Sequence, residues 1–281
     1  MSVTAGLPAR FAKMSGAGND FVMFLGTPSG SAAEAEAIRR LCDRRKGIGA
    51  DGVLFVQKDG AEIVADYFNA DGILSRFCGN GTRCAARLAS LRLGAGDDFA
   101  VSTGWGRVGA RIGADGRVTL ALPEVVRAGR KLSTLGLGVG VIAAEAIEVL
   151  VGVPHLVVAV AEGASLDALD VGAFGPPLRR HPEMPEGANV NFVAKTGPST
   201  LAVRTWERGV ENETLACGSG VVASAAVAAF SGLAPPVGIR TRSGETLVVD
   251  FQRTPDAIAE IHLEGDARLL FEGEIRWEEW R

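Results

Sequence analysis

The chain has few cysteines, and their spacing excludes several classes of site. Only 4 of its 281 residues are Cys, too few for a small secreted fold held together by disulfides. None of them lies in a Cys-x-x-Cys pair, the spacing typical of structural zinc sites and thioredoxin-like redox sites. The sequence therefore predicts reduced thiols in a cytoplasmic protein without a metal site.

A dense Lys/Arg run and an apolar leader are also missing. The formal net charge is −4, and without a basic run the chain lacks the electrostatic footprint of a nucleic-acid binder, so nucleic acid is not expected as a partner. Residues 1–10 contain no apolar core of the kind that a signal peptide needs. Export is therefore not expected.

One uncharged stretch, Thr214–Ile239, is long enough to cross a bilayer. It opens with Cys217-Gly-Ser-Gly, is rich in Ala, Gly and Ser, and ends at Pro235-Pro236 and the three residues after them. A helix that is apolar on every side can equally be buried in a protein core. We expect a buried helix and no membrane partner.

Glycine, by contrast, is abundant. The chain has 37 Gly, about 13 % of its residues against an average of roughly 7 %. Since no low-complexity tract holds them, we expect tight turns and places where the backbone approaches a ligand closely. Hydrophobic residues make up 47 % and charged residues 22 %, which is typical of a globular protein, and the length fits two domains.

Short apolar runs bounded by turn residues predict many strands and few helices. Helices are predicted over Ala32–Arg44, from just after Cys78-Gly-Asn-Gly81 to Arg92, and from Cys217-Gly-Ser-Gly220 onward. Strands are predicted at Phe11–Met14, Phe21–Leu25, Val53–Val56, Ile63–Phe68, Gly106–Ile112, Arg117–Leu122, Ala146–Val151, Leu156–Val160, Leu201–Trp206 and beyond Ile239. Pro123 and the Gly-rich stretch Gly129–Gly140 predict a crossover between domains.

The two Cys-Gly-x-Gly segments, at Cys78 and Cys217, lie about half a chain length apart. A repeat at that spacing predicts two similar halves, each a sheet-rich unit wrapped around one helix. The repeat is imperfect, because the first helix carries Arg83, Arg87 and Arg92 whereas the second is uncharged.

Each of these segments places a thiol at the predicted start of a helix. The unpaired N–H groups and partial positive charge there favour thiolate, so we expect each thiol to have a pKa below its ordinary value of about 8.5. The N–H groups of Gly79 and Asn80, or of Gly218 and Ser219, offer a place for a carboxylate. Two such sites on opposite sides of one carbon predict removal of a proton from one face and its return to the other.

Several segments together resemble diaminopimelate epimerase. They are Met14–Phe21, Phe68–Gly72, Cys78–Cys84, Trp206–Gly209 and Glu213–Gly220, which follow one another in order over nearly the whole chain. The resemblance implies interconversion of LL- and meso-diaminopimelate, in lysine and peptidoglycan precursor biosynthesis. It implies an isomerase that needs no pyridoxal phosphate or other cofactor, acting on a small amino-acid substrate as a homodimer.

The resemblance also implies a fold class. The implied fold class is an α/β (α+β) protein of two pseudo-symmetric domains. Each domain would be a mostly antiparallel sheet wrapped around a central helix, with the active site in the interdomain cleft. The first domain would comprise residues 1–122, completed by a C-terminal strand at about 270–281, and the second residues 123–269.

Residue by residue, the resemblance assigns a site. Cys78 and Cys217 match the family's catalytic thiols. The matches to its substrate-holding side chains are Asn19, Asn69, Asn189, Glu207 and Arg208, and the matches to its backbone carboxylate binders are Gly79, Asn80, Gly218 and Ser219. His155, like Glu207, matches a residue thought to modulate the thiol pKa. Because one end of the substrate is a zwitterion, a cation for its carboxylate and acceptors for its ammonium agree with these assignments.

Structural roles are the alternative for most of these residues. Asn19 and Asn69 precede turn residues, Arg208 beside Glu207 fits a surface ion pair, and His155 fits a buried structural histidine. A free Cys is usually a small buried apolar residue. That role is assigned to Cys42 and Cys84, which lie at interior helix positions.

Three departures from the family pattern put the substrate in question. They are Val153 where many members have Asn, an extra residue within Val210–Glu213, and the stretch Ile73–Phe77. The competing hypotheses are a related two-cysteine racemase or epimerase acting on proline, hydroxyproline or histidine, and a non-catalytic module that binds small anions at two helix N-termini.

Overall fold

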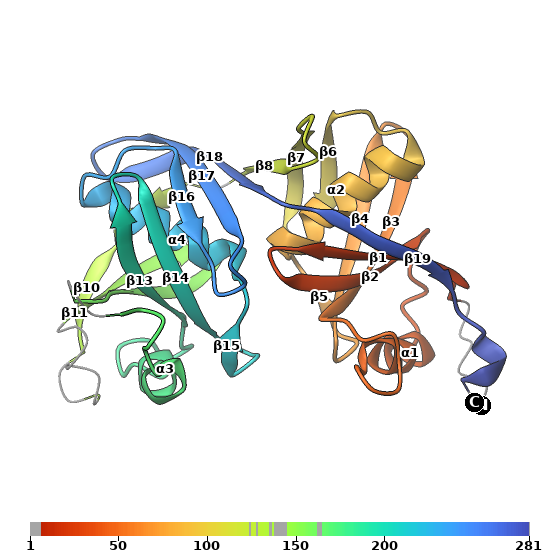
Figure 1. Ribbon diagram of the computed structural model, residues 1–281, viewed down its shortest axis with the longest axis horizontal. Coiled ribbons are helices and arrows are strands. Elements are labelled where there is room, and N and C mark those ends of the chain that lie inside the picture. The colour runs from red at the N-terminus through yellow and green to blue at the C-terminus, as the bar shows by residue number, and fades with distance from the viewer. Residues whose placement is uncertain are drawn as a thin grey trace. The chain divides into compact units, whose positions relative to one another are not determined.

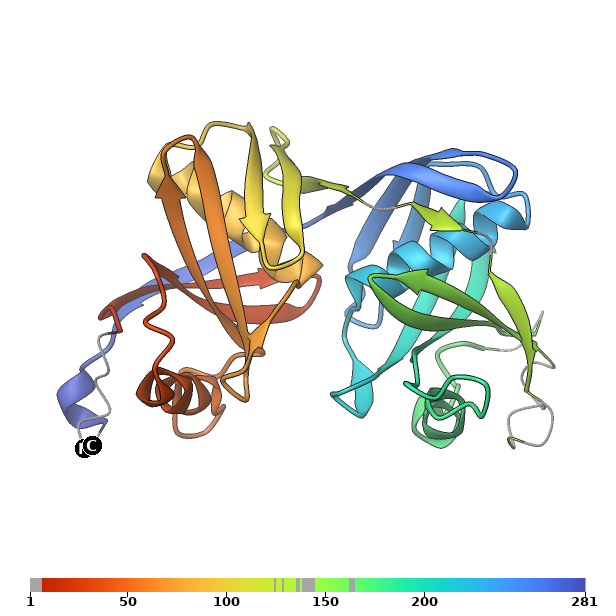
Figure 2. The same cartoon turned by 180° about the vertical axis from the view of Figure 1, so that it is seen from behind.

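The computed structural model describes residues 7–123, 125–127, 129–134, 137, 145–161 and 165–280. The chain divides into two compact units: Met1–Ala121 with Gly265–Arg281, and Leu122–Glu264. In each unit a strongly curved sheet wraps around one long helix (Figures 1 and 2). This is the mixed fold that the sequence predicted for each half.

The first unit contains nine strands, two α-helices and a 3-10 turn in its described part. The strands are β1 (Arg10–Gly16), β2 (Asn19–Leu25), β3 (Gly52–Asp59), β4 (Glu62–Asn69), β5 (Leu74–Ser75), β6 (Asp98–Thr103), β7 (Gly106–Ile112), β8 (Val118–Leu122) and β19 (Arg268–Glu274). The helices are α1 (Ala32–Cys42) and α2 (Gly79–Leu93), and the turn is η1 (Trp277–Glu279).

Hydrogen bonding orders this sheet as β19, β1, β2, β3, β4, β6, β7 and β8. Only β2 with β3 and β4 with β6 pair in parallel. The last strand, β19, lies along β1, so the chain's C-terminal part completes this sheet (Figure 1). The short strand β5 pairs with the end of β4 and leads directly into the start of α2.

Helix α2 fills the inside of this sheet because one of its faces is made of small apolar side chains. Cys84, Ala85, Ala86, Leu88 and Ala89 are all buried, and burying a Leu side chain contributes roughly 1.5–3 kcal/mol. The helix ends at Gly94, whose φ of 60° is left-handed and is easily adopted only by Gly.

Helix α1 starts where its sequence indicates and ends two residues early. Ser31 caps it by accepting a hydrogen bond from the N–H of Glu34, which satisfies a donor of the first turn. Its last residue is Cys42, not the predicted Arg44, because Asp43 turns to an extended conformation.

The second unit repeats the same plan. Its strands are β9 (Val126–Arg127), β10 (Arg130–Ser133), β11 (Glu145–Val151), β12 (Val153–Ala159), β13 (Asn189–Gly197), β14 (Thr200–Glu207), β15 (Asn212–Thr214), β16 (Val237–Arg240), β17 (Thr246–Arg253) and β18 (Ala257–Gly265). Its helices in the described residues are α3 (Val171–Arg179) and α4 (Gly218–Phe230).

The pairing pattern confirms the predicted internal repeat. The order is β10, β11, β12, β13, β14, β16, β17 and β18, with β12–β13 and β14–β16 parallel. The short strand β15 lies against the end of β14 and leads into α4, as β5 leads into α2. The central helix therefore starts beside the end of the corresponding strand in each unit, β4 in the first and β14 in the second.

The uncharged stretch is a buried helix, as predicted. Val221, Val222, Ala223, Ala225 and Ala226 of α4 are each fully buried, so the helix is enclosed by its own unit. Among the described residues no helix is long and apolar enough to cross a membrane.

Several elements of the second unit were not predicted: strands β9, β13 and β15, helix α3 and strand β10. Helix α3 contains Pro176 and Pro177, which mask a helical pattern. It packs so tightly on β14 that a Cβ at Gly175 would lie 2.6 Å from the ring of Trp206. The predicted crossover loop Gly129–Gly140 contains strand β10 instead, and its residues 135, 136 and 138–140 lie outside the described residues.

Candidate functional site

Cys78 is the residue that caps helix α2. Its backbone is extended, with φ −141° and ψ 109°, and its Sγ accepts a hydrogen bond from the N–H of Gly81 at 3.4 Å. The Cys78 carbonyl oxygen accepts the first helical bond from Thr82 at 2.7 Å. A half-buried sulfur at this position sits in the field of the helix N-terminus, which favours its anionic form.

Cys217 occupies the same position at the start of α4. Its φ of −120° and ψ of 110° match those of Cys78, and its carbonyl oxygen likewise accepts from Val221 at 2.9 Å. Its sulfur does not cap the helix and lies 3.5 Å from the hydroxyl oxygen of Ser219. The sequence thus placed both thiols correctly at helix starts.

The other two cysteines belong to the interior, as predicted. Burial raises the pKa of the Cys42 thiol to about 12 and raises that of the Cys84 thiol as well. Both thiols stay protonated at neutral pH and do not serve as bases.

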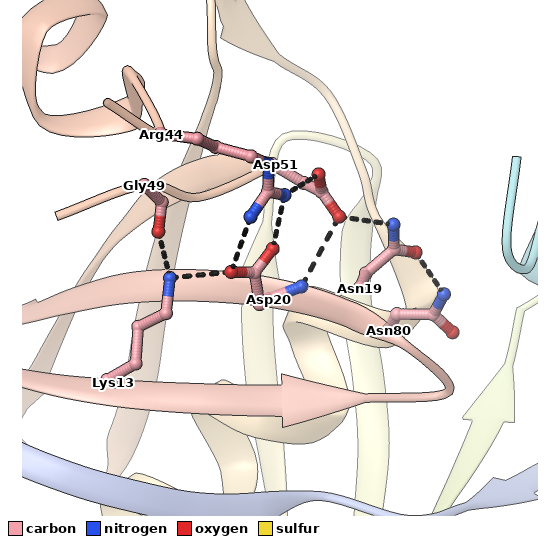
Figure 3. Close-up of polar contacts among 7 residues, drawn as sticks. All are labelled: Lys13, Asn19, Asp20, Arg44, Gly49, Asp51 and Asn80. Carbon is pink, nitrogen blue, oxygen red and sulfur yellow. Dashed lines mark hydrogen bonds and ion pairs between the residues drawn. The ribbon is translucent and has the colours of Figure 1, made fainter. Parts of the chain in front are cut away.

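Asn19 and Asn80 are hydrogen-bonded to each other beside the start of α2 (Figure 3). Asn80 Nδ2 donates to Asn19 Oδ1 at 2.6 Å, and Asn19 Nδ2 donates to Asp51 Oδ2 at 2.8 Å. On its other side Asn80 Oδ1 accepts from Arg83 Nη2 at 2.7 Å. The sequence singled out the two asparagines and missed Asp51 and Arg83 as their partners.

A charged cluster adjoins this pair of amides. Arg44 contacts Asp51 at 2.6 Å and Asp20 at 2.7 Å, and Lys13 contacts Asp20 at 2.7 Å (Figure 3). Burial alone would raise the pKa of Asp20, but hydrogen bonds from Arg44 and Lys13 outweigh it and hold that pKa below its ordinary value. The Asp20 carboxyl group is therefore ionised at neutral pH.

Asn69 lies at the end of β4 and closes a turn through its backbone. Its N–H donates to Ile73 O at 3.0 Å, and its carbonyl oxygen accepts from Gly72 at 2.9 Å. Its side chain is exposed. Asn69 therefore has the structural role in a turn that was the alternative to substrate binding. This role leaves its side-chain amide exposed to solvent.

The departure at Ile73–Phe77 places an aromatic side chain directly before Cys78 in the sequence. Phe77, directly before the thiol, packs on Trp105 with ring centroids 4.6 Å apart. Trp105 lies in the tight turn between β6 and β7. Ile73 and Leu74 are 63 % and 58 % exposed, so this segment offers apolar surface close to the start of α2.

In the second unit, Asn189, Glu207 and Arg208 are brought together. Asn189 begins β13 and Glu207 ends β14, and these strands pair through Val190 and Trp206. Asn189 Oδ1 accepts from the backbone N–H of Arg208 at 2.8 Å. The Arg208 side chain donates to the carbonyl oxygen of Glu186 at 3.1 Å, at an exposed position.

His155 is fully buried on β12. Burial, with a smaller contribution from the charge of Arg208, lowers its pKa to about 3. A histidine with that pKa is neutral at physiological pH, so its ring carries no positive charge that could stabilise a thiolate. Among the described residues its Nε2 has no hydrogen-bond partner.

Asn191, which sequence reasoning missed, fixes His155. Its Nδ2 lies 3.1 Å from His155 Nδ1 and donates to Leu156 O at 3.3 Å, while its Oδ1 accepts from Thr205 at 3.0 Å. Since the amide group donates to Nδ1, the ring proton sits on Nε2. The signal was an Asn-Val-Asn run on an apolar strand, which puts two amides on one face.

Among the described residues no group of three or more His, Cys, Asp and Glu side chains is arranged to hold a metal ion. The amides of Asn19 and Asn80 and the guanidinium group of Arg83 lie near the start of α2, and the amide of Asn191 and the hydroxyl of Ser219 lie near the start of α4. N–H donors of this kind can hold a carboxylate.

A protein-family model matches most of the chain. The model described as diaminopimelate epimerase matches residues 11–127 and 147–269. The chain is 38 % identical to a diaminopimelate epimerase of Gemmatimonas aurantiaca, with 94 % of this chain and 98 % of the relative covered. It is 36 % identical to one of Aquifex aeolicus, covering 94 % of this chain and 97 % of that protein.

Solved structures share the fold at low sequence identity. One is a phenazine biosynthesis PhzC/PhzF protein from Clostridium difficile, with a TM-score of 0.70, 12 % identity and coverage of 95 % and 99 % of the two chains. Another is a probable proline racemase from Agrobacterium radiobacter K84, with a TM-score of 0.65, 14 % identity and coverage of 95 % and 92 %.

Proposed function

The chain belongs to the diaminopimelate epimerase family, and from this premise we propose that it interconverts LL- and meso-diaminopimelate, with Cys78 and Cys217 as the acid–base pair. The observation that carries the proposal is the matched placement of the two thiols. Each Cys occupies the N-cap position of the central helix of its unit, in the same extended backbone conformation.

The chemistry follows from that placement. One sulfur, as thiolate, takes the α-proton and becomes a thiol, while the electron pair of the C–H bond moves toward the α-carboxylate. The second sulfur, as thiol, gives its proton to the opposite face of the α-carbon and becomes a thiolate. The pair ends with its protonation states exchanged, and proton exchange with solvent restores them.

The helix N-termini supply the stabilisation of the intermediate. As the α-carbon loses its proton, charge builds up on the substrate carboxylate, and preorganised N–H donors stabilise that charge more than they stabilise the ground state. Gly79 and Asn80 on one helix, and Gly218 and Ser219 on the other, are the proposed donors. With this stabilisation no pyridoxal phosphate or other cofactor is required.

Side chains hold the far end of the substrate. Arg208 offers a planar guanidinium for a carboxylate, and Glu207 with the amides of Asn19, Asn69 and Asn189 offers acceptors for an ammonium group. Two charged ends distinguish diaminopimelate from proline, hydroxyproline or histidine. The proposal extends to a cytoplasmic homodimer that serves lysine and peptidoglycan precursor synthesis.

Exchange of the α-hydrogen in D₂O tests the substrate. LL-Diaminopimelate is expected to gain deuterium at the α-carbon as the meso form appears, while proline, hydroxyproline and histidine gain none. Faster exchange with one of those three amino acids would favour a related racemase and contradict the proposed substrate.

Single substitutions test the two thiols. Cys78→Ala and Cys217→Ala are each expected to lower epimerisation by more than about 10³-fold, because general acid–base groups contribute 10²–10⁴-fold and here both are needed in every turnover. Binding of meso-diaminopimelate, measured calorimetrically, should persist. Cys42→Ala, at an interior thiol, is the matched control and should retain turnover. Undiminished turnover in Cys78→Ala would contradict the two-thiol mechanism.

A further inference from the structure

Four side chains of the first unit form a continuous series of hydrogen bonds, here called the amide chain: Arg83, Asn80, Asn19 and Asp51. Arg83 Nη2 donates to Asn80 Oδ1 at 2.7 Å, Asn80 Nδ2 donates to Asn19 Oδ1 at 2.6 Å, and Asn19 Nδ2 donates to Asp51 Oδ2 at 2.8 Å. Figure 3 shows the part from Asn80 to Asp51 and the cluster beyond it.

The amide chain runs in one direction because its ends differ in chemistry. A guanidinium group only donates, so Asn80 must turn its oxygen to Arg83 and its amino group to Asn19. An ionised carboxylate only accepts, so Asn19 must turn its amino group to Asp51. The two ends therefore demand the same orientation of both amides. A flipped Asn19 would oppose oxygen to carboxylate on one side and amino group to amino group on the other.

Both ends of the amide chain are anchored. Arg83 is fully buried, and its Nε donates to the carbonyl oxygen of Asp266 at 3.3 Å. The Asp51 carboxylate accepts from Arg44 at 2.6 Å and from the backbone N–H of Asp20 at 3.3 Å, in addition to the bond from Asn19. Neither end can turn to follow an amide that flips.

We propose that Asp51 and Arg83 are positioning residues for substrate recognition: they hold the amide of Asn19 in one orientation, so that it offers a fixed donor and a fixed acceptor to the amino-acid substrate. The inference rests on the proposed function, which makes Asn19 a substrate-holding residue. A solvated asparagine samples both orientations and loses that freedom on binding. An asparagine side chain that is already fixed loses less entropy when the substrate binds.

The amide chain also links substrate recognition to the start of α2. Asn80 is the second residue of that helix, and Thr82 and Gly81 of the same turn bond to Cys78. Asn80 is 2 % exposed, so its amide is held inside the protein. The amide chain therefore reaches from Asp51 to the helix turn that follows the thiol.

A double-mutant cycle tests the proposal. Asp51→Ala is expected to raise the KM for LL-diaminopimelate about 10-fold and to change kcat less than about 3-fold, because it frees the orientation of one binding group and leaves the reacting groups in place. In an Asn19→Ala background the same substitution should change kcat/KM less than about 2-fold, because residues that act through each other are not additive.

Several outcomes would overturn the proposal. An equal loss of kcat/KM from Asp51→Ala in both backgrounds would show that Asp51 has a general structural role. An unchanged KM in the single variant would show that Asp51 has no role in substrate recognition. Full activity of Asn19→Ala would overturn it too, since nothing would remain to be positioned. Asp98→Ala, which breaks the exposed ion pair of Asp98 with Arg111, is the matched control and should leave KM and kcat unchanged.

A second measurement does not depend on activity. In ¹⁵N-labelled wild-type protein the side-chain NH₂ resonances of Asn19 and Asn80 should be dispersed and exchange slowly with solvent. In the milder variant Asp51→Asn those of Asn19 should move toward the position of free amides. Free-amide resonances of Asn19 in the wild type would overturn the inference. Absence of epimerase activity with dispersed resonances would instead count against the proposed function alone.

Discussion

Gly220 packs so closely against Asn191 that a Cβ atom at position 220 would lie well under 3.0 Å from Asn191 Oδ1. Gly220 is in the first turn of α4, just after Cys217, and Asn191 is fully buried on β13. This contact sets how near the thiol-bearing turn comes to the sheet. The second glycine of the Cys-Gly-x-Gly segment is thus required by packing in this unit.

Gly220→Ala is expected to destabilise the protein by about 1–3 kcal/mol, the usual cost of overpacking a core. Asn191 cannot move aside, because its amide is bonded to His155, Leu156 and Thr205. Turnover should fall with stability, since the helix start that holds Cys217 must shift. Urea unfolding and the epimerisation rate measure the two effects.

The matched control is Gly81→Ala, at the same position of the first unit. A Cβ there would meet only the Leu54 side chain, at 3.3 Å and 3.4 Å, and the Cβ of Cys78 at 3.5 Å. Leu54 can yield slightly, and Ala is favoured over Gly inside a helix, so the free energy of unfolding should change by less than about 1 kcal/mol. Equal destabilisation by the two substitutions would contradict this explanation.

Stability should depend on pH through His155. Its pKa in the folded protein is about 3 against an ordinary value of 6.5, so between these values the unfolded chain binds a proton that the folded protein does not. The contribution of a neutral His155 to the free energy of unfolding is therefore fully present above pH 6.5. It is lost as the pH falls toward 3, by up to about 1.4 kcal/mol per pH unit.

His155→Gln should remove this dependence, because glutamine does not titrate. Urea unfolding at neutral pH and at mildly acidic pH should show a smaller drop for the variant than for the wild type. His262→Gln, at an exposed position, is the control and should behave like the wild type. Parallel pH profiles for His155→Gln and the wild type would refute the assignment of a neutral buried imidazole.

Glu211 ties the loop after β14 to helix α3. Its carboxylate accepts from Arg179 at 2.8 Å and from the N–H of Gly209 at 3.2 Å, and its own N–H donates to Glu207 O at 2.8 Å. Glu211→Ala should loosen the loop that carries Arg208. We expect a KM for LL-diaminopimelate about 3- to 10-fold higher with nearly unchanged kcat, the pattern of lost ground-state binding.

Steady-state kinetics check this prediction against a control in the same unit. Glu183→Ala breaks an ion pair with Arg130 in which both side chains are about half exposed, and exposed pairs of this kind contribute little. Its KM should stay at the wild-type value. A fall in kcat at constant KM in Glu211→Ala would place the loop in the chemical step and not in binding.

The local features of the candidate site were predictable from the sequence. A Cys followed by Gly-x-Gly and a breaker-free run predicts a thiol at a helix start, and both thiols are there because capping and helix formation depend on neighbours within one turn. The repeat of that segment predicted two similar halves, each a sheet wrapped around one helix, and the two units have this plan. Neighbouring residues also predicted that Cys84 lies inside a helix and that Cys78 lies at the start of the same helix.

The partners of the site residues were not predictable, because they come from distant segments. Asp51 lies on the approach to β3, 32 residues from Asn19, and Asn191 meets Gly220 only because β13 passes the first turn of α4. Helix α3 exists despite Pro176 and Pro177 because Gly175 lets it pack on Trp206.

The sequence by itself determined which chemical groups stand at the helix starts, since backbone hydrogen bonding and turn residues act over a few positions. Only the tertiary structure decided which way the amides of Asn19, Asn80 and Asn191 point. An amide has no preferred orientation of its own, and it takes one from the donors and acceptors that folding brings against it.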